Sequence, residues 1–189
     1  MVSEEQAKLG QDLCAGLPVE VRLQDYRELN GQFDAIVSIG MIEHVGQKNY
    51  RTFMKIVHSC LKDGGIFLLH TIGCNRSVRK GESWFERYIF PNGMFPSIKQ
   101  LAESFEGLFV VEDWENLGAH YDRTLMAWFE NFHKNWNTLK RLYDERFYRM
   151  WKHYLLACAG SFRALKNQLW QIVLSKGGLQ GGRTIAPRC

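Results

Sequence analysis

Three ionisable side chains come directly after three successive strand-like segments of the chain. Asp25, Glu43 and His70 each follow a short apolar run. A carboxylate in such a place can accept a hydrogen bond from a ligand hydroxyl or from a bound acid, and a histidine beside it can take part in acid–base chemistry. Open parallel sheets bind ligands beyond the carboxyl ends of their strands. We therefore expect the three side chains to meet at one site.

Each candidate also has a purely structural interpretation. Glu43 could stabilise a helix N-terminus through the helix dipole. His70 has apolar neighbours and could be a hydrogen-bonded core residue, and Asp25 could cap a turn. Tyr121 could donate to an anion, whereas Asp122 could cap the helix that follows. Glu43 and His70 alone do not make a ligand set, so no metal site is predicted.

The elements that position these residues follow from apolar patterning and from glycine turns. Strand, helix, glycine turn and strand recur in that order, which predicts an α/β protein with a mainly parallel sheet. The expected strands are residues 19–23, 33–39, 66–69, 108–114 and 169–174. The expected helices include residues 3–15 and 47–61 and one that begins after Ser97.

Aromatic residues make up 13% of the chain, and many of them lie between Trp114 and Trp170. Their spacing of three and four residues predicts two helices before the last strand. The simpler interpretation of such a stripe is helix core. The alternative is a slot for a large apolar ligand, with a basic rim that suits a membrane interface. The rim would comprise Arg141, Arg146, Arg149, Lys152 and Arg163.

Composition narrows the possible classes of protein. The 189 residues suit one domain with at most a small second lobe, and 46% hydrophobic with 23% charged residues indicates a globular chain. A net charge of +4 is too small to indicate nucleic acid as a partner. The chain has no long uncharged apolar window, no signal-peptide pattern and no CxxC pair among its five cysteines. We therefore expect a cytoplasmic protein.

Several long segments resemble cyclopropane-fatty-acyl-phospholipid synthase, in matching order up to about residue 178. They are LQDYRELNGQFDAIVSIGMIEHVG (23–46), GGIFLLHTIG (64–73), YIFPNGMFPS (88–97), VEDWENLGAHYDRTLMAWFENF (111–132), YLLACAGSFR (154–163) and QLWQIVLSKG (168–177). The mycolic acid cyclopropane synthases are more distant members of this family. The resemblance implies an S-adenosylmethionine-dependent methyltransferase that adds a methylene unit to a cis double bond of a phospholipid acyl chain. It also implies work at the inner face of the membrane.

The resemblance assigns roles to particular positions. Glu43, His70, Ile72 and Tyr121 match the family positions that hold a bicarbonate ion, which serves as general base. A carboxylate can lie next to bicarbonate only if the two share a proton, because two bare anions repel. The positions implied for binding S-adenosylmethionine are Gln6, Gln24, Asp25, Ile39 and Gly40. The aromatic helices correspond to the acyl-binding insertion.

The chain also departs from the family. The glycine-rich loop that holds a nucleotide-type cofactor is absent, since no GxGxG occurs, and none of the five cysteines matches the family's active-site cysteine. The family sheet runs 3-2-1-4-5-7-6, and strands 1 and 2 are missing. The predicted fold is therefore a Rossmann-like methyltransferase sheet that lacks its first two strands, with an aromatic-rich helical lobe inserted before the last strand. We expect residues 1–178 to form this partial domain, with the insertion at about 115–165 and a flexible tail at 179–189.

The missing strands have consequences for activity and assembly. Without the cofactor loop, the chain alone is expected to be inactive. The alternatives are a non-catalytic lipid-binding or structural remnant, or a methyltransferase that acts on another apolar substrate. The strand at 33–39 would have an unpaired edge, which is a liability in a soluble protein. Either residues 1–30 cover that edge, or two chains pair there as a homodimer.

Overall fold

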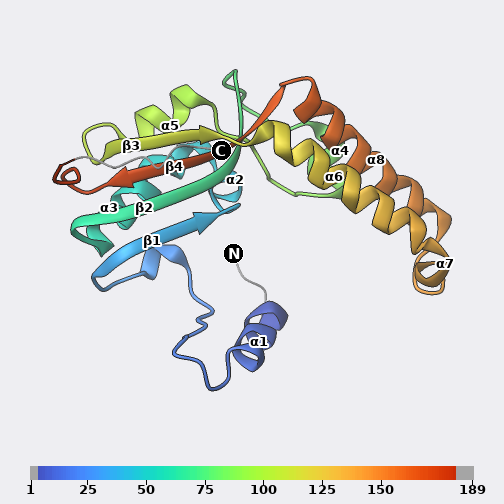
Figure 1. Ribbon diagram of the computed structural model, residues 1–189, viewed down its shortest axis with the longest axis horizontal. Helices are drawn as coiled ribbons and strands as arrows, with labels where there is room; N and C mark the ends of the chain where they lie inside the picture. Colours follow the sequence, from blue (N-terminus) through green and yellow to red (C-terminus); the bar gives the residue numbers. More distant parts are fainter. Residues whose placement is uncertain (1–3, 182–189) are drawn as a thin grey trace.

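The computed structural model describes residues 4–181 and has two parts, a four-stranded sheet and a helical lobe that projects from one end of it (Figure 1). The strands lie in the order β1-β2-β4-β3. Their bounds are β1 Phe33–Ile39, β2 Leu61–Cys74, β3 Val110–Asn116 and β4 Asn167–Ser175. The last eight residues of the predicted flexible tail lie outside the described part of the chain.

The sheet is mixed, so the prediction of a mainly parallel sheet is wrong. Only β1 and β2 pair in parallel, whereas β4 is antiparallel to both β2 and β3. Strands β1, β2 and β3 run in the same direction, and β4 alone is reversed. Because β4 lies between β2 and β3, this one reversal makes two of the three pairings antiparallel. The strand-by-strand pattern could not show that the last strand enters between two earlier ones.

The strand predicted at residues 19–23 is not formed. This segment is extended but irregular, and its apolar side chains Val19 and Leu23 are more than half exposed. It contacts α1 (Glu4–Leu13), where Gln11 Nε2 donates to the Val21 carbonyl at 3.2 Å. A strand needs a neighbour to complete its backbone hydrogen bonds. None of residues 4–30 pairs with β1, so these residues do not cover its edge.

One face of the sheet is covered by α3 (Tyr50–Cys60) and α5 (Ile98–Phe105). Phe53, Met54 and Val57 of α3 pack in the core with Phe67 of β2. The start of α5 follows the prediction, because the Ser97 hydroxyl and the Gln100 side chain form a reciprocal capping box. The core therefore lies between the sheet and these two helices.

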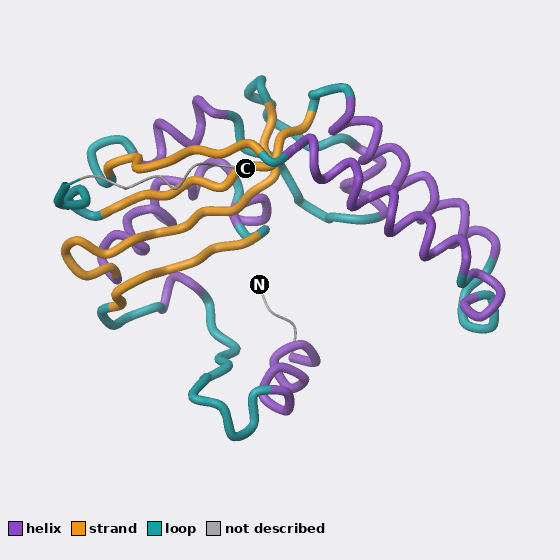
Figure 2. The backbone as a smooth tube through the Cα atoms, in the orientation of Figure 1, coloured by secondary structure: helices purple, strands orange, loops and turns teal. Residues whose placement is uncertain are grey.

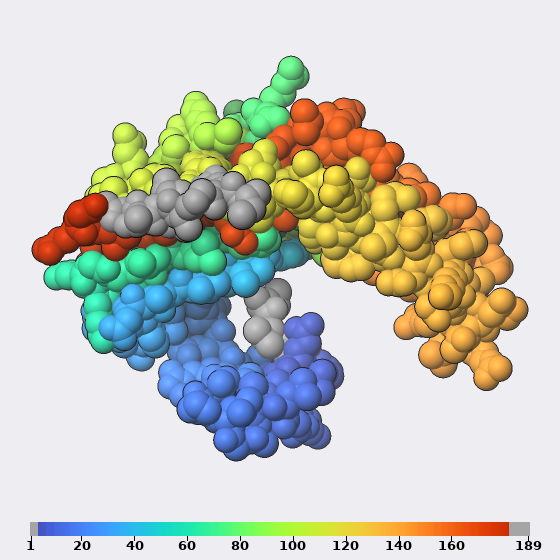
Figure 3. Space-filling model, viewed as in Figure 1, coloured from blue at the N-terminus to red at the C-terminus, as the bar shows by residue number. Residues whose placement is uncertain are grey.

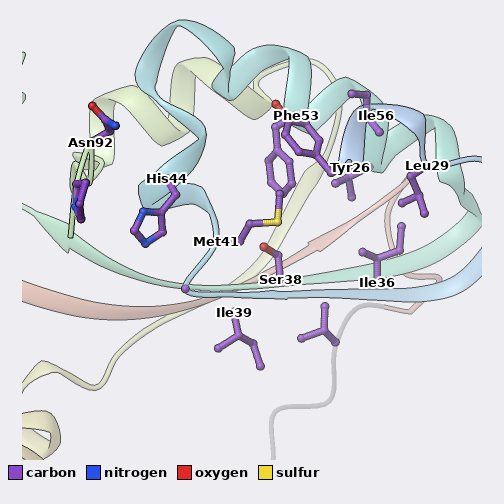
Figure 4. Close-up of a pocket in the computed structure, with 14 residues that line it drawn as sticks. Tyr26, Leu29, Ile36, Ser38, Ile39, Met41, His44, Phe53, Ile56 and Asn92 are labelled. Carbon is purple, nitrogen blue, oxygen red and sulfur yellow. The ribbon is translucent and has the colours of Figure 1, made fainter. Parts of the chain in front are cut away.

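The opposite face of the sheet carries exposed apolar side chains. Alternation along β1 turns Ile36 and Ser38 towards α3 and turns Ile39 away from it (Figure 4). Val37 and Ile39 are 57% and 69% exposed. In the space-filling view, the lobe and the segment that contains α1 both extend below the sheet, with a hollow between them (Figure 3).

The lobe consists mainly of two long antiparallel helices, which are the aromatic helices that the spacing predicts (Figure 2). They are α6 (Gly118–Lys134) and α8 (Glu145–Arg163), joined through the short α7 (Trp136–Leu139). The lobe has its own core of Leu125, Phe132, Leu155, Ala159, Phe162 and Leu169. Within residues 4–181, no helix has both the length and the apolar character that crossing a bilayer requires.

Two polar residues of the lobe have roles that differ from their predicted ones. Asp122 is not a helix cap, because α6 begins at Gly118, so Asp122 lies inside the helix. Its carboxylate instead accepts two hydrogen bonds from the Arg163 guanidinium, at 2.9 and 3.0 Å. Arg163 therefore ties α8 to α6 and is not free to act as part of the basic rim.

Candidate functional site

The candidate site is built around Glu43, which lies just beyond the end of β1. Gly40 has a φ of +61°, which glycine adopts without strain, and turns the chain from β1 into α2 (Ile42–Val45). Glu43 is only 5% exposed. Its Oε1 accepts a hydrogen bond from the backbone N–H of Ile72 at 2.8 Å, whereas its buried Oε2 has no partner among the described residues.

Glu43 lies in the first turn of α2, as the helix-dipole interpretation expects. Its carboxylate does not cap the helix, because the N-cap of α2 is Met41 and no side chain caps it. Glu43 instead reaches across to β2. A buried carboxylate oxygen without a partner is costly, because desolvation disfavours it unless a donor is supplied. The free Oε2 therefore marks a place where a ligand can donate a hydrogen bond.

His70 and Ile72 lie on β2 next to Glu43. Alternation along β2 buries Leu69 and Thr71 on the α3 side and leaves His70 and Ile72 half-buried on the other side. His70 is not a member of either core cluster among the described residues. Its carbonyl accepts from the Gly40 N–H at 3.0 Å, which joins the ends of β1 and β2. Ile72 packs against the core of the lobe, so it connects the sheet part of the site to the helical part.

Tyr121 enters the site from the lobe. Its ring packs edge-on against Phe162, with 5.0 Å between ring centroids, and against Trp128 at 5.9 Å. Burial raises the pKa of the Tyr121 phenol, and the nearby Cys158 thiol and Glu43 carboxylate raise it further. The phenol therefore stays protonated at neutral pH and can donate a hydrogen bond. The structure thus brings Glu43, Ile72 and Tyr121 together, with His70 on the same strand as Ile72.

Two further residues of α8, Tyr154 and Cys158, border this site. From the sequence alone, both are assigned only to an aromatic stripe. Tyr154 packs edge-on against Phe85 and Phe90, at 6.2 and 5.9 Å between centroids. Burial, followed by the charges of Cys158 and Tyr121, raises the pKa of Tyr154 to about 12. Burial alone raises the pKa of Cys158 to about 11. The sequence feature that could have identified them is their separation by four residues, which places both on one face of α8.

A cavity of about 680 Å³ lies beside β1 and contains two of the predicted cofactor positions. Ile39 and Gly40 line it together with Tyr26, Met41 and His44 (Figure 4). Ser38 also lines the cavity on the α3 side, and it is a second buried polar residue whose hydroxyl has no partner among the described residues. The cavity therefore combines apolar walls with a polar group that a ligand could satisfy.

The other three predicted cofactor positions do not line this cavity. The Asp25 carboxylate accepts from the backbone and guanidinium of Arg27, and these bonds lower the pKa of Asp25 to about 2. The Gln24 side chain donates to the Glu28 carbonyl at 2.9 Å. Gln6 lies on the exposed surface of α1. Within residues 4–181, no group of three or more potential metal ligands comes together.

Comparisons with known proteins find relatives along nearly the whole chain. Residues 1–172 match the family model described as mycolic acid cyclopropane synthetase. The chain is 54% identical over 182 residues to the cyclopropane-fatty-acyl-phospholipid synthase of Escherichia coli K12, covering 96% of the chain and 48% of that protein. A probable fatty acid methyltransferase of Pseudomonas putida is 37% identical over 188 residues, covering 93% of the chain and 48% of that protein. The chain thus spans about half the length of these curated relatives.

Solved structures show the same relationship. The cyclopropane synthase MmaA2 of Mycobacterium tuberculosis superposes with a TM-score of 0.84 at 28% identity, over 92% of this chain and 67% of that one. The mycolic acid cyclopropane synthase CmaA1, complexed with SAH and CTAB, superposes with a TM-score of 0.81 at 30% identity, with the same coverage. The fold is therefore the α/β methyltransferase fold of the cyclopropane synthases.

Proposed function

Because this chain belongs to the mycolic acid cyclopropane synthetase family, we propose that it forms part of an enzyme that cyclopropanates phospholipid acyl chains with S-adenosylmethionine. The observation that carries the proposal is the buried Glu43 Oε2, which has no described partner and lies between the sheet and the aromatic lobe. The cavity beside β1 offers a place for S-adenosylmethionine. The apolar lobe near Glu43 offers a place for the acyl chain.

In the proposed reaction, the π electrons of the cis double bond form a bond to the methyl carbon, and the sulfonium sulfur keeps the electrons of the broken C–S bond. The resulting carbocation loses a proton from the new methyl group, and the electrons of that C–H bond close the ring. Bicarbonate, when bound, would supply the base that takes this proton.

The chain's own residues fit a bound bicarbonate. Glu43 Oε2 would accept the bicarbonate hydroxyl proton, so that the two anions share it and do not repel each other. Tyr121 and His70 would donate to the remaining oxygens. The Ile72 N–H is already used by Glu43 Oε1, so its role is to orient the carboxylate. This division of roles gives both oxygens of the buried Glu43 carboxylate a hydrogen-bond partner.

The lobe offers a place for the acyl chain and a surface for the membrane. Tyr121 presents an aromatic wall near Glu43, and Tyr154 lies near Tyr121. At the far end of the lobe, Leu142 and Tyr143 are 80% and 44% exposed beside Lys140 and Arg141. Apolar side chains flanked by cations suit the interface of an anionic bilayer. We therefore place the protein at the inner face of the membrane, with the lobe towards the lipid.

Calorimetric titration of S-adenosylmethionine into the chain tests the enzymatic proposal. We expect saturable binding that is weakened by Gly40→Val, since a side chain at a φ of +61° is strained and Gly40 lines the cavity. Gly107→Val, at a φ of +69° and not among the residues that line the cavity, is the matched control. Absence of binding, with vesicle binding retained, would contradict the enzymatic proposal and favour a lipid-binding protein without catalysis.

The free edge of β1 leads to a second proposal, that two copies of the chain associate through it. Val37 and Ile39 are exposed there, and an uncovered apolar edge strand tends to pair. Light scattering is expected to give a mass of twice 22.0 kDa, and Val37→Lys is expected to return it to the monomer value. A monomeric wild-type chain at the same concentration would refute this assembly.

A further inference from the structure

A second cavity, of about 510 Å³, lies between α8 and α4 (Ser83–Tyr88), on the outer side of the lobe. One face of α8 lines this cavity. The four residues that α8 contributes are Arg146, Arg149, Met150 and His153, at spacings of three, one and three. The lining residues are Trp84, Tyr88, Arg146, Arg149, Met150 and His153. None of these residues belongs to the site around Glu43.

The cavity concentrates positive charge that no carboxylate neutralises. Arg27 and Arg163 each form an ion pair with an aspartate. Among the described residues, neither Arg146 nor Arg149 has an ion-pair or hydrogen-bond partner. Two guanidinium groups one helical turn apart present a set of donors that matches the oxygens of a phosphate.

Aromatic contacts hold the wall of this cavity. The Trp84 ring lies 4.5 Å from His153 and 5.6 Å from Tyr88, measured between ring centroids. The Arg87 guanidinium carbon lies 5.4 Å from the centre of the Tyr88 ring. Trp84 thus spans the gap between the two helices, and the exposed Arg146 and Arg149 line the same cavity. A preorganised wall reduces the entropy lost when a ligand binds.

The position of the cavity relates it to the acyl site. Tyr154 follows His153 directly and packs against Phe85 of α4 and against Phe90. Nine residues separate Arg149 from Cys158, which corresponds to about 13 Å along the helix axis. One lipid could therefore place a polar group near Arg149 while its acyl chain extends towards Tyr121.

We propose that Arg146, Arg149 and His153 bind the phosphate of a phospholipid headgroup, with Trp84 and Tyr88 against the glycerol. This inference rests on the proposed function, because it identifies where the substrate's headgroup lies. The chemistry recognised is a phosphate oxyanion, which a soluble phosphate ester shares with a lipid. The test must therefore separate these two sources.

The first measurement is NMR of the side chains with sn-glycerol 3-phosphate as the probe. The Nε–H signals of Arg146 and Arg149 and the Cε1–H signal of His153 are expected to shift together and to saturate. The second measurement is sedimentation with vesicles of phosphatidylglycerol in phosphatidylcholine at physiological salt. Arg146→Gln with Arg149→Gln is expected to weaken vesicle binding at least about tenfold, since two charge-assisted hydrogen-bonding groups are lost.

Arg123→Gln with Lys134→Gln is the control, because it removes the same charge from exposed positions on α6. We expect it to weaken vesicle binding less than about threefold through general screening alone. Equal losses in the two double variants, or shifts that do not saturate, would overturn the site. Saturable shifts without any change in vesicle binding would show a site for soluble phosphate and would overturn the headgroup assignment.

The outcomes also separate this inference from the proposed function. If the cavity binds as expected but the chain does not bind S-adenosylmethionine, then the enzymatic proposal fails and the phosphate site stands. If S-adenosylmethionine binds but the arginine variants behave like the control, then only the phosphate site fails.

Discussion

In the enzyme of which this chain forms part, Glu43→Gln is expected to lower formation of cyclopropane lipid by about 10²–10⁴-fold while the protein stays folded. The amide oxygen of glutamine can still accept from the Ile72 N–H, so the bond at 2.8 Å is kept. The other end of the side chain then becomes an NH₂ donor at the place where Oε2 accepts. A bicarbonate hydroxyl loses its acceptor there, and the base is no longer held for proton removal.

Two measurements check this result. Mass spectrometry of lipid after incubation with S-adenosylmethionine reports ring formation, and NMR with ¹³C-labelled bicarbonate reports binding directly, whether or not turnover occurs. Glu130→Gln is the matched control, because Glu130 is exposed on α6. Unchanged bicarbonate binding in Glu43→Gln would refute the role given to Oε2, and loss of binding in Glu130→Gln would show a general charge effect.

Phe162→Ala is expected to destabilise the chain by about 3–5 kcal/mol. The ring is 1% exposed, belongs to the core of the lobe and supports Tyr121 edge-on. Removing it leaves a cavity between α6 and α8 and deprives Tyr121 of its nearest aromatic neighbour. Urea unfolding followed by circular dichroism measures the loss, and the transition should move to lower urea concentration with a similar slope.

Trp128→Ala tests whether this cost comes from burial. Trp128 also contacts Tyr121 edge-on, but its side chain is 46% exposed. Its removal should cost about 1 kcal/mol, because less apolar surface returns to water. If the two alanine variants cost the same, the lobe does not have the tightly packed core described here.

Part of the fold and of the site could be predicted from local pattern. Ser97 and Gln100 sit three residues apart before an apolar helix, and the capping box forms between them. The apolar run at 33–39 forms β1, and the aromatic spacing forms α6 and α8. Glu43 follows a strand and a glycine, and the structure does bury it beside β2. For the helices and strands, the decisive contacts lie within a few residues or a whole segment is apolar, whereas the contact of Glu43 with Ile72 joins residues 29 positions apart.

The failures share a different cause. Residues 19–23 alternate between apolar and polar side chains, as a strand does. Whether they form a strand depends on a neighbouring strand, which the local sequence does not specify. Asp122 looked like a cap, but the cap of α6 is Leu117, five residues earlier than expected. The reversed insertion of β4 between β2 and β3 depends on which strands pair, and pairing is a long-range property.

The sequence by itself determined which residue types are available, which segments become helices and buried strands, and the family resemblance. Only the tertiary structure decided that one carboxylate oxygen of Glu43 has no partner among the described residues. It also decided that Tyr121 of the lobe lies near this carboxylate. It also decided that Arg146 and Arg149 face Trp84 across a cavity. Helix and strand formation are governed by neighbours along the chain, whereas a site is formed by side chains that packing brings together from distant elements. Whether a polar atom finds a partner can therefore be known only after the chain has folded.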